Sequence, residues 1–454
     1  MLTGSLLFYA YNRWWTIVVI LGYCFVDWRI GLLLSRVEHR QLVLTIGVTF
    51  NVALLAFWKY APLVFAGITA SIPQPAAVPL LDDWVIPLGI SFFAFSGISY
   101  MVDVHRGGFK PEPSFWRYSL FTAFFPHLVA GPILRAGEFL VHLRPGELPA
   151  RPLAEWEGTF LVARGYFKKT VLADTIAVAI DPFFANVSNS ATDGVWALPY
   201  VYLYALQIYF DFSGYTDIAR GLGLWFGFRW PENFNWPYLA TSIQEFWRRW
   251  HMTLSRFLRD YLYIPLGGNR RGPLRTAINL TITMVFGGLW HRGGLSFGLW
   301  GLLHAAYLLV NHFWHALPLS ARLAGLRGVP AYAYAALSVI LTFHAVCFAW
   351  CFFRLTDLRD ALACIGKLVV FDLDKPLAGA AADSGLWLLL AAYALATAGA
   401  MVVSRGAPVC RAAQQLKRAP MLLGFCWGGA VGLLVLAAAL APHGESSPFI
   451  YFRF

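Results

Sequence analysis

Long stretches without a Lys, Arg, Asp or Glu residue recur along the chain. They span residues 41–58, 60–81, 84–102, 295–321, 328–353, 384–404 and 419–444. Each reaches or approaches the length of about 20 residues that a helix needs to cross a bilayer. Strict alternation of apolar and polar residues is absent, and only helices or closed barrels satisfy all backbone polar groups in lipid. The pattern predicts an all-α polytopic membrane protein with about ten to eleven transmembrane helices plus re-entrant or interfacial helices.

A different pattern covers residues 242–263, which read as one amphipathic helix. Its polar side carries Glu245, Arg249, Arg256 and Asp260, and its apolar side carries Phe246, Trp250, Leu254, Phe257 and Tyr261. The polar residues are spaced for two ion pairs, Glu245–Arg249 and Arg256–Asp260. His251 lies at the border of the apolar face, from which it would face a cavity. The alternative is a helix in the membrane interface with its basic side toward lipid headgroups.

Composition and charge support a membrane protein. Of the 454 residues, 58% are hydrophobic and 13% are charged, against about 25% charged in soluble domains. The net charge of +11 gathers in a few loops, which the positive-inside rule explains without nucleic acid. A consistent topology requires segments 116–140 and 239–265 to enter the membrane and return, and loop 355–383 to lie outside. We find no internal repeat and expect a single domain over 1–454.

Histidines are the strongest candidates for chemistry. His291 ends a short apolar segment and has glycine pairs on both sides, Gly287-Gly288 and Gly293-Gly294, which we expect to leave room for a substrate. An imidazole shielded from water tends to be neutral, and a neutral imidazole can take a proton from a hydroxyl. The alternative is a helix-end histidine bonded to a backbone carbonyl.

The remaining histidines favour ordinary packing or hydrogen bonding. His304, His312 and His315 share one apolar segment, where we expect satisfied histidines between packed helices; His127 and His344 receive the same interpretation. The six cysteines form no CxxC, and the chain has no HExxH, GxSxG or phosphate-binding loop. We therefore expect no metal site and no bound cofactor.

Several segments resemble the membrane-bound O-acyltransferase (MBOAT) family. They are IPLGISFF at 86–93, FFPHLVAGPILR at 124–135, YFDFSGYTDIARGLG at 209–223, PENFNWPYLATSIQEFWRRWHMTLSRFLRDYLYIPLGGNR at 231–270, GGLWH at 287–291 and FAWCFFR at 348–354. In family order they cover most of residues 85–355, the expected motif-bearing core. The IPLGGNR ending favours the branch of alginate-type exopolysaccharide acetylases over the branch that transfers D-alanyl groups.

The resemblance implies a helical bundle around a central tunnel, with an essential histidine that falls on His291 and a second polar site that falls on His251. The chain also departs from the family pattern. Arg292 follows the Trp-His pair where glycine is usual, and His127 replaces a usual glutamine. Relatives usually have one more apolar helix before the segment that starts here at residue 5. These departures bear on the substrate more than on the reaction.

The implied function is transfer of an acyl group, acetyl by expectation, from a cytoplasmic thioester such as acetyl-CoA to a hydroxyl of an exopolysaccharide such as alginate. His291 would act as general base or transient acyl carrier, and His251 would orient or protonate. The further residues expected to line the tunnel or touch substrate are Trp290, Asn233, Asn235, Asp211, Arg248, Arg249, Arg292 and His127. Of these, Asn233, Asn235 or the Trp290 N–H would stabilise an oxyanion. Arg248 and Arg249 would attract an anionic donor or anchor to phospholipid.

The same resemblance implies a multi-pass protein of the bacterial inner membrane that works with a periplasmic acetyltransferase and a polysaccharide acceptor. Two rival interpretations belong to other classes of protein. One is a transporter or flippase, which would also have broken helices and charge within the membrane. The other is a scaffold of a polysaccharide-secretion complex without chemistry of its own.

Overall fold

The computed structural model describes residues 1–11, 13–70, 86–128, 131–143, 152–188 and 197–369, together with Trp387, Leu390, Ala391, Gly432 and Phe449. Regular structure among these residues is helical, as the apolar pattern predicts. The chain divides into two compact units. The first comprises Met1–Arg151, Phe226–Pro237 and Ser242–Ala324; the second comprises Pro152–Trp225, Tyr238–Thr241 and Gly325–Phe454. The single domain expected for 1–454 stays a prediction.

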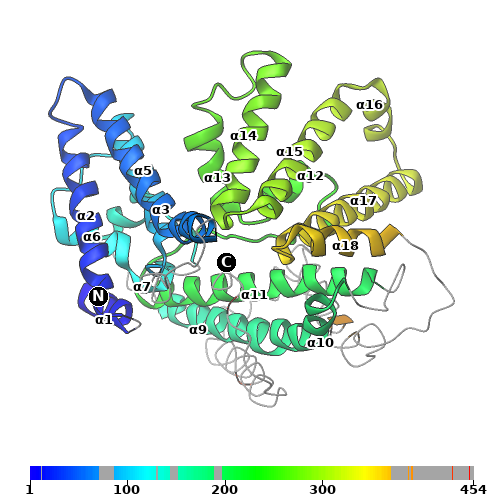
Figure 1. Ribbon diagram of the computed structural model, residues 1–454, viewed down its shortest axis with the longest axis horizontal. Coiled ribbons are helices and arrows are strands. Elements are labelled where there is room, and N and C mark those ends of the chain that lie inside the picture. The colour runs from blue at the N-terminus through cyan, green and yellow to red at the C-terminus, as the bar shows by residue number, and fades with distance from the viewer. Residues whose placement is uncertain are drawn as a thin grey trace. The chain divides into compact units, whose positions relative to one another are not determined.

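The first unit carries the histidine motifs. Its helices are α1 (Leu2–Ala10), α2 (Thr16–Leu33), α3 (Arg40–Ala70), α5 (Ile90–His105), α6 (Phe115–Ala123), α7 (Phe125–Leu128), α8 (Ala136–Phe139), α12 (Ile243–Arg249), α13 (Met252–Leu258), α14 (Gly272–His291), α15 (Leu295–Ala316) and α16 (Pro318–Ala324) (Figure 1). A 3-10 turn, Leu140–Leu143, follows α8, and a π-helical turn, Arg259–Tyr263, follows α13. Segment 116–140, expected to enter the membrane and return, is thus a run of short helices.

The second unit is built around one long helix. Its helices are α9 (Pro152–Phe167), α10 (Asp174–Ala185), α11 (Leu198–Trp225), α17 (Val329–Arg354) and α18 (Leu358–Val369), with a π-helical turn at Lys168–Ala173. A further 3-10 turn, Pro237–Leu239, lies where the chain passes from the first unit into the second. Helices α9 and α11 run side by side (Figure 1).

Three described helices are long and apolar enough to cross a membrane: α2, the Arg40–Pro62 part of α3, and α17. Helix α17 confirms the stretch predicted at 328–353. The stretches at 41–58 and 60–81 were expected to be separate, but α3 continues through both as far as residue 70. Lysine is a good helix former, so Lys59 does not end the helix.

Two other expected segments differ or lie elsewhere. The stretch at 295–321 divides after Ala316, because Leu317 takes an extended conformation before Pro318, as the residue before a proline usually does. The stretches at 384–404 and 419–444 lie outside the described residues, apart from Leu390, Ala391, Gly432 and Trp387.

A buried polar cluster joins α2, α3, α5 and α6. Asn51 donates a hydrogen bond to the Asp27 carboxylate at 2.9 Å, and Tyr118 donates to the same carboxylate at 3.4 Å. The Tyr23 hydroxyl lies within hydrogen-bond distance of two acceptors, the Asn51 side-chain oxygen and the Phe93 carbonyl oxygen. Polar side chains that bond across helices hold membrane helices together where the hydrophobic effect does not. This cluster therefore fixes the helices that flank the histidine motifs.

Glycines set the packing of α9 against α11. A Cβ atom added at Gly165 would lie 2.4 Å from the Gly214 carbonyl oxygen, and one added at Gly158 would lie 2.8 Å from that of Gly221. The two pairs run in opposite order along the chain, so the helices are antiparallel. Small residues at such an interface let two backbones approach closely.

Candidate active site

The segment expected to form one amphipathic helix over 242–263 is broken in the middle. Helix α12 ends at Arg249 and α13 begins at Met252. Between them His251 has φ 40° and ψ 55°, in the left-handed region. A non-glycine residue pays about 1–2 kcal/mol for that conformation, so it persists only where its surroundings impose it. The prediction of a continuous helix was wrong, and the break falls on the predicted functional histidine.

Asn233 holds this break in place. Its side-chain oxygen accepts hydrogen bonds from the backbone N–H of Thr253 at 3.1 Å and from the Thr253 hydroxyl at 2.8 Å. The backbone N–H of Met252 donates to the Asn233 carbonyl at 3.0 Å, and His251 Nδ1 lies 3.4 Å from the Asn233 side-chain oxygen. The Asn233 side-chain amide nitrogen, in contrast, is buried with no hydrogen-bond partner among the residues that the structure describes.

The indole of Trp290 lies against both predicted histidines. Its ring centroid is 4.8 Å from that of His291, at an angle of 68°, and 6.4 Å from that of His251. All three side chains are buried, with exposed fractions of 4%, 6% and 0% for Trp290, His291 and His251. The indole N–H has no hydrogen-bond partner within the described part of the chain. His251 and His291, which are 40 positions apart in the sequence, therefore both lie beside the Trp290 ring, whose N–H is available to donate a hydrogen bond.

A stack of three aromatic rings fixes that indole. Phe95 of α5 stacks on Trp290 with centroids 4.9 Å apart and planes at 14°, and on Phe257 of α13 with centroids 3.9 Å apart and planes at 15°. Stacked aromatic pairs contribute about 0.5–1.5 kcal/mol beyond the area that they bury. The stack ties the helix that ends in His291 to the helix that begins after His251.

Close packing of α14 against α15 fixes the end of α14 that carries His291. A Cβ atom at Gly288 would lie 2.2 Å from the Phe297 carbonyl oxygen, and one at Gly301 would lie 2.4 Å from that of Met284. The expectation that Gly287-Gly288 leaves room for a substrate was therefore wrong for Gly288, which makes room for α15. Nothing lies within 4 Å of a Cβ added at Gly294, on the other side of the histidine.

One of the two ion pairs predicted for this segment is present on α12, and the other is replaced at the far end of α13. The pair Glu245–Arg249 is confirmed at 2.5 Å. The pair Arg256–Asp260 was predicted wrongly: Arg256 pairs with Glu138 at 3.1 Å, and Asp260 pairs with Arg135 at 2.5 Å. The helix turns into a π-helical segment at Arg259, which changes the spacing that the prediction assumed.

Asp260 is the centre of this anchor. Partial burial alone would raise the pKa of its carboxyl group, but hydrogen bonds and charges from Arg259 and Arg135 lower that pKa below its ordinary value. Arg106 donates two further hydrogen bonds to the Asp260 backbone carbonyl at 3.2 Å. The carboxylate is thus kept charged by Arg135 and Arg259, while Arg106 holds the backbone of the same residue.

The remaining predicted tunnel residues do not converge on the two histidines in the same way. The side chains of Asn235, Arg248 and Arg292 are exposed, and Arg249 is held by Glu245. Asp211 belongs to α11 of the second unit, where Lys169 pairs with it at 3.0 Å. Their proposed contacts with substrate stay predictions.

His127 is buried in a cluster of aromatic rings. Its Nε2 atom lies 2.9 Å from the Phe121 carbonyl oxygen, and the rings of Phe124, Phe139 and Trp230 surround it. This environment matches the packing and hydrogen-bonding role predicted from sequence. A place in the tunnel for His127 stays a prediction.

The histidines of α15 do not form the satisfied row that was expected. His312 and His315 are exposed. His304 is fully buried, and neither of its ring nitrogens has a hydrogen-bond partner among the described residues. Its ring lies 4.7 Å from that of Trp300, which also packs against His291 at 5.6 Å. The expectation failed because the helix presents residues 312 and 315 beyond the packed region.

Two residues beside the site were missed. Lys59 and Tyr60 of α3 donate hydrogen bonds to backbone carbonyls at the end of α14. The signal was present in the sequence, because Lys59 is an isolated charge between two uncharged stretches. Ionisable groups at membrane depth are costly and tend to mark functional positions.

No group of three or more His, Cys, Asp or Glu residues among those described has the geometry of a metal site. What the site contains is a pair of imidazoles and N–H donors around an indole. Such groups suit proton transfer and stabilisation of a developing oxyanion.

Comparison with known proteins decides the family. The family model described as "MBOAT, membrane-bound O-acyltransferase family" matches residues 106–353, which include both histidines and the aromatic stack around Trp290 apart from Phe95. The chain belongs to the membrane-bound O-acyltransferase family. As a member of this family, the protein is a membrane-bound O-acyltransferase, and the transporter and scaffold interpretations lose their basis.

Curated relatives extend the match over the whole chain. The probable alginate O-acetylase AlgI of Pseudomonas putida is 35% identical over 472 aligned residues, covering 100% of this chain and 94% of that protein. A peptidoglycan O-acetyltransferase of Helicobacter pylori is 34% identical over 81% of this chain and 72% of its own length. A teichoic acid D-alanyltransferase of Bacillus subtilis is 28% identical over 76% of this chain and 90% of its own length.

Proposed function

We propose that this acyltransferase O-acetylates an exopolysaccharide of the alginate type, using His291 as general base. The observation that carries the proposal is the burial of His291 and His251 beside one indole, that of Trp290. The names of the relatives support the acyl group and the acceptor, because the two kinds of relative at about 35% identity are O-acetylating enzymes of polysaccharides or peptidoglycan.

The chemistry requires one proton acceptor and one oxyanion donor. The acceptor hydroxyl attacks the thioester carbonyl of acetyl-CoA or another acetyl thioester, and its proton passes to the His291 imidazole. A C–O bond forms, the C–S bond breaks, and the proton passes from the imidazolium to the leaving thiolate. The Trp290 N–H and the Asn233 amide N–H are the donors for the oxyanion, since both are buried without a partner in the described residues. His251 orients the acceptor.

The proposed setting is a multi-pass protein of the bacterial inner membrane, with about ten to eleven crossings around a tunnel. The thioester would enter from the cytoplasm, and the acceptor hydroxyl would belong to a periplasmic acetyltransferase that passes the acetyl group on to the polymer. The described spans α2, α3 and α17 support a membrane location. Arg248, exposed at the end of α12, is available to attract the anionic donor.

The test uses an alginate-producing bacterium that lacks its own alginate O-acetylase. The wild-type chain should restore acetyl groups to the polymer, measured by NMR of the purified polysaccharide. His291→Ala should abolish acetylation at an unchanged protein level. His312→Ala, an exposed histidine on α15, is the matched control and should acetylate normally. Full acetylation by His291→Ala would refute the proposal.

A further inference from the structure

The final turn of α14 is held from outside the helix. The last carbonyls of a helix have no partner within it and carry a partial negative charge. Here these carbonyls belong to Leu289, Trp290 and His291, the last three residues of the GGLWH segment. The last bond within the helix, from the Arg292 N–H to the Gly288 carbonyl, is long at 3.5 Å. The turn that carries the histidine is therefore weakly closed by its own backbone.

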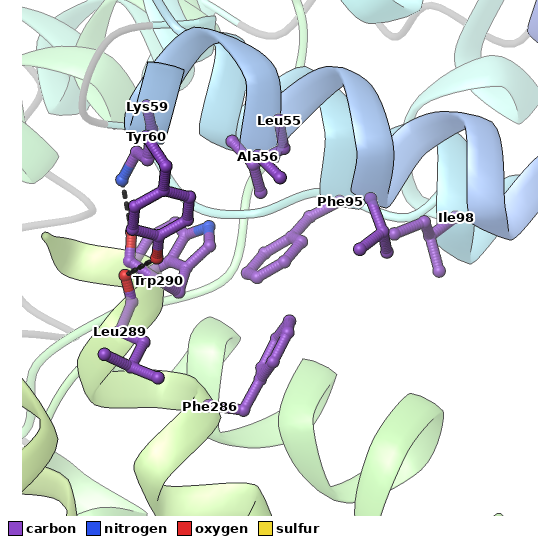
Figure 2. Close-up of a pocket in the computed structure, with 10 residues that line it drawn as sticks. Leu55, Ala56, Lys59, Tyr60, Phe95, Ile98, Phe286, Leu289 and Trp290 are labelled. Carbon is purple, nitrogen blue, oxygen red and sulfur yellow. Dashed lines mark hydrogen bonds between the residues drawn. The ribbon is translucent and has the colours of Figure 1, made fainter. Parts of the chain in front are cut away.

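Helix α3 supplies the missing donors. The Lys59 ammonium donates to the carbonyl oxygen of Trp290 and, at 3.0 Å, to that of His291. The Tyr60 hydroxyl donates to the carbonyl oxygen of Leu289 at 2.7 Å. Figure 2 shows both side chains reaching from α3 to this turn. Three consecutive carbonyls are thus capped by two adjacent residues from a helix about 230 positions earlier in the chain.

Lys59 also touches the indole. Its ammonium lies 5.5 Å from the centroid of the Trp290 ring, within the range of a cation–π contact. Phe95 stacks on the same ring at 4.9 Å. The backbone and the ring of Trp290 are therefore both contacted by groups on α3 and α5.

The surroundings of Lys59 are apolar, so filling space does not explain why the residue is charged. It lines a pocket of about 290 Å³ whose other walls are almost entirely apolar and include Leu55, Phe95, Phe286 and Leu289 (Figure 2). No carboxylate is among the described residues that line the pocket. A half-buried ammonium among apolar side chains is costly unless strong acceptors surround it, and the acceptors here are the carbonyls of the Trp-His turn. An apolar residue would fill the same space without that cost.

We propose that Lys59 and Tyr60 are positioning residues of the acyl-transfer site: they cap the last turn of α14 and so fix the direction in which Trp290 and His291 project. The proposal rests on the proposed role of His291. It assigns no contact between Lys59 and the substrate.

The kinetic test compares Lys59→Met, Lys59→Arg and Tyr60→Phe with the control Phe57→Leu, an α3 side chain that is 51% exposed. Inside-out membrane vesicles from the alginate-producing strain receive labelled acetyl-CoA, and transfer into polymer is measured against acetyl-CoA concentration. Lys59→Met should lower the maximal rate by roughly tenfold to a hundredfold, as expected for a catalytic group displaced by a fraction of an ångström to about 1 Å. KM should change less than about twofold, since binding energy is not removed.

The conservative variants separate positioning from folding. Lys59→Arg keeps the donors and the charge and should recover much of the rate, whereas Tyr60→Phe should show a smaller loss than Lys59→Met. Phe57→Leu should match the wild type. A normal rate in both Lys59→Met and Tyr60→Phe, in a preparation where His291→Ala is inactive, would overturn the proposal.

A second measurement does not depend on the activity. Hydrogen–deuterium exchange of the purified protein should be faster in Lys59→Met than in Phe57→Leu for peptides that cover residues 284–294, because the turn loses its cap. If the wild-type chain does not restore acetyl groups to the polymer in cells, the proposed function fails, and the difference in exchange between Lys59→Met and Phe57→Leu then decides by itself whether the cap exists. Unchanged exchange in that peptide would refute it.

Discussion

Asn233 accepts two hydrogen bonds from Thr253, one from its backbone N–H and one from its hydroxyl. The loop before α12 thereby holds the first turn of α13. The Thr253 hydroxyl oxygen accepts in turn from the backbone N–H of Ile133 at 3.0 Å. Segments that contain Ile133, Asn233 and Thr253 thus meet at Thr253, two residues after the left-handed His251.

Replacing Asn233 tests this anchor. Asn233→Ala leaves the buried Thr253 N–H without its acceptor, which costs about 1–3 kcal/mol, and releases the backbone that imposes the His251 conformation. We expect a lower midpoint of thermal unfolding in detergent and a strong loss of polymer acetylation. Asn235→Ala is the control for stability, because its exposed side chain leaves the backbone bond to Arg249 intact. Equal midpoints for the two variants would contradict the anchor.

The left-handed backbone at His251 predicts an unusual order of stabilities. Glycine adopts this region freely, whereas alanine pays about 1–2 kcal/mol. His251→Gly should therefore unfold at a higher temperature than His251→Ala, although both lack the imidazole and should fail to acetylate polymer. At the next residue, Met252, which is helical, the order should reverse: Met252→Ala should unfold at a higher temperature than Met252→Gly. The usual alanine advantage at both positions would argue against the observed backbone.

The crossing of α14 and α15 predicts a sharp difference between two glycines. Gly288→Ala forces a Cβ into the Phe297 carbonyl and should destabilise the protein by about 1–3 kcal/mol, with loss of activity as α15 moves away. A Cβ at Gly298 meets only Leu289, at 3.9 Å. Gly298→Ala should be neutral or gain up to about 1 kcal/mol from helix propensity. Thermal unfolding of both variants decides the point, and similar midpoints would speak against this crossing.

The indole N–H of Trp290 can be removed with little change in packing. Trp290→Phe keeps a ring to stack on Phe95 but loses the donor, and loss of one oxyanion donor costs about 10²–10³ in rate. We expect that scale of loss in labelled-acetyl transfer, with a much smaller effect on unfolding. Trp247→Phe removes another buried indole N–H that lacks a partner in the described residues, and should retain activity. Comparable rates in the two variants would remove Trp290 from the proposed chemistry.

The features that could be predicted from the sequence were those that depend on residues close together in the chain. An apolar stretch with no charge identified α17, and the resemblance placed His291 and His251, which the structure brings to one indole. Contacts between distant segments left no such signal. The break at His251 depends on Asn233 and Thr253, and a helical pattern over 242–263 does not reveal it. Gly288 is needed because the Phe297 backbone of the next helix approaches it closely, and the local sequence does not show that contact. Lys59 was visible as an isolated charge, but its partners are backbone carbonyls, which have no signature in sequence.

The glycine contacts between α9 and α11 also limit how this pair can move. Two contacts seven residues apart, Gly158–Gly221 and Gly165–Gly214, engage together. A slide by one turn would set both glycines against larger neighbours at once and force the backbones apart. Piston-like motion of one of these helices along the other is therefore blocked. Any gating of access to the enzyme must come from other elements, and mutagenesis aimed at mobile parts should leave this pair untouched.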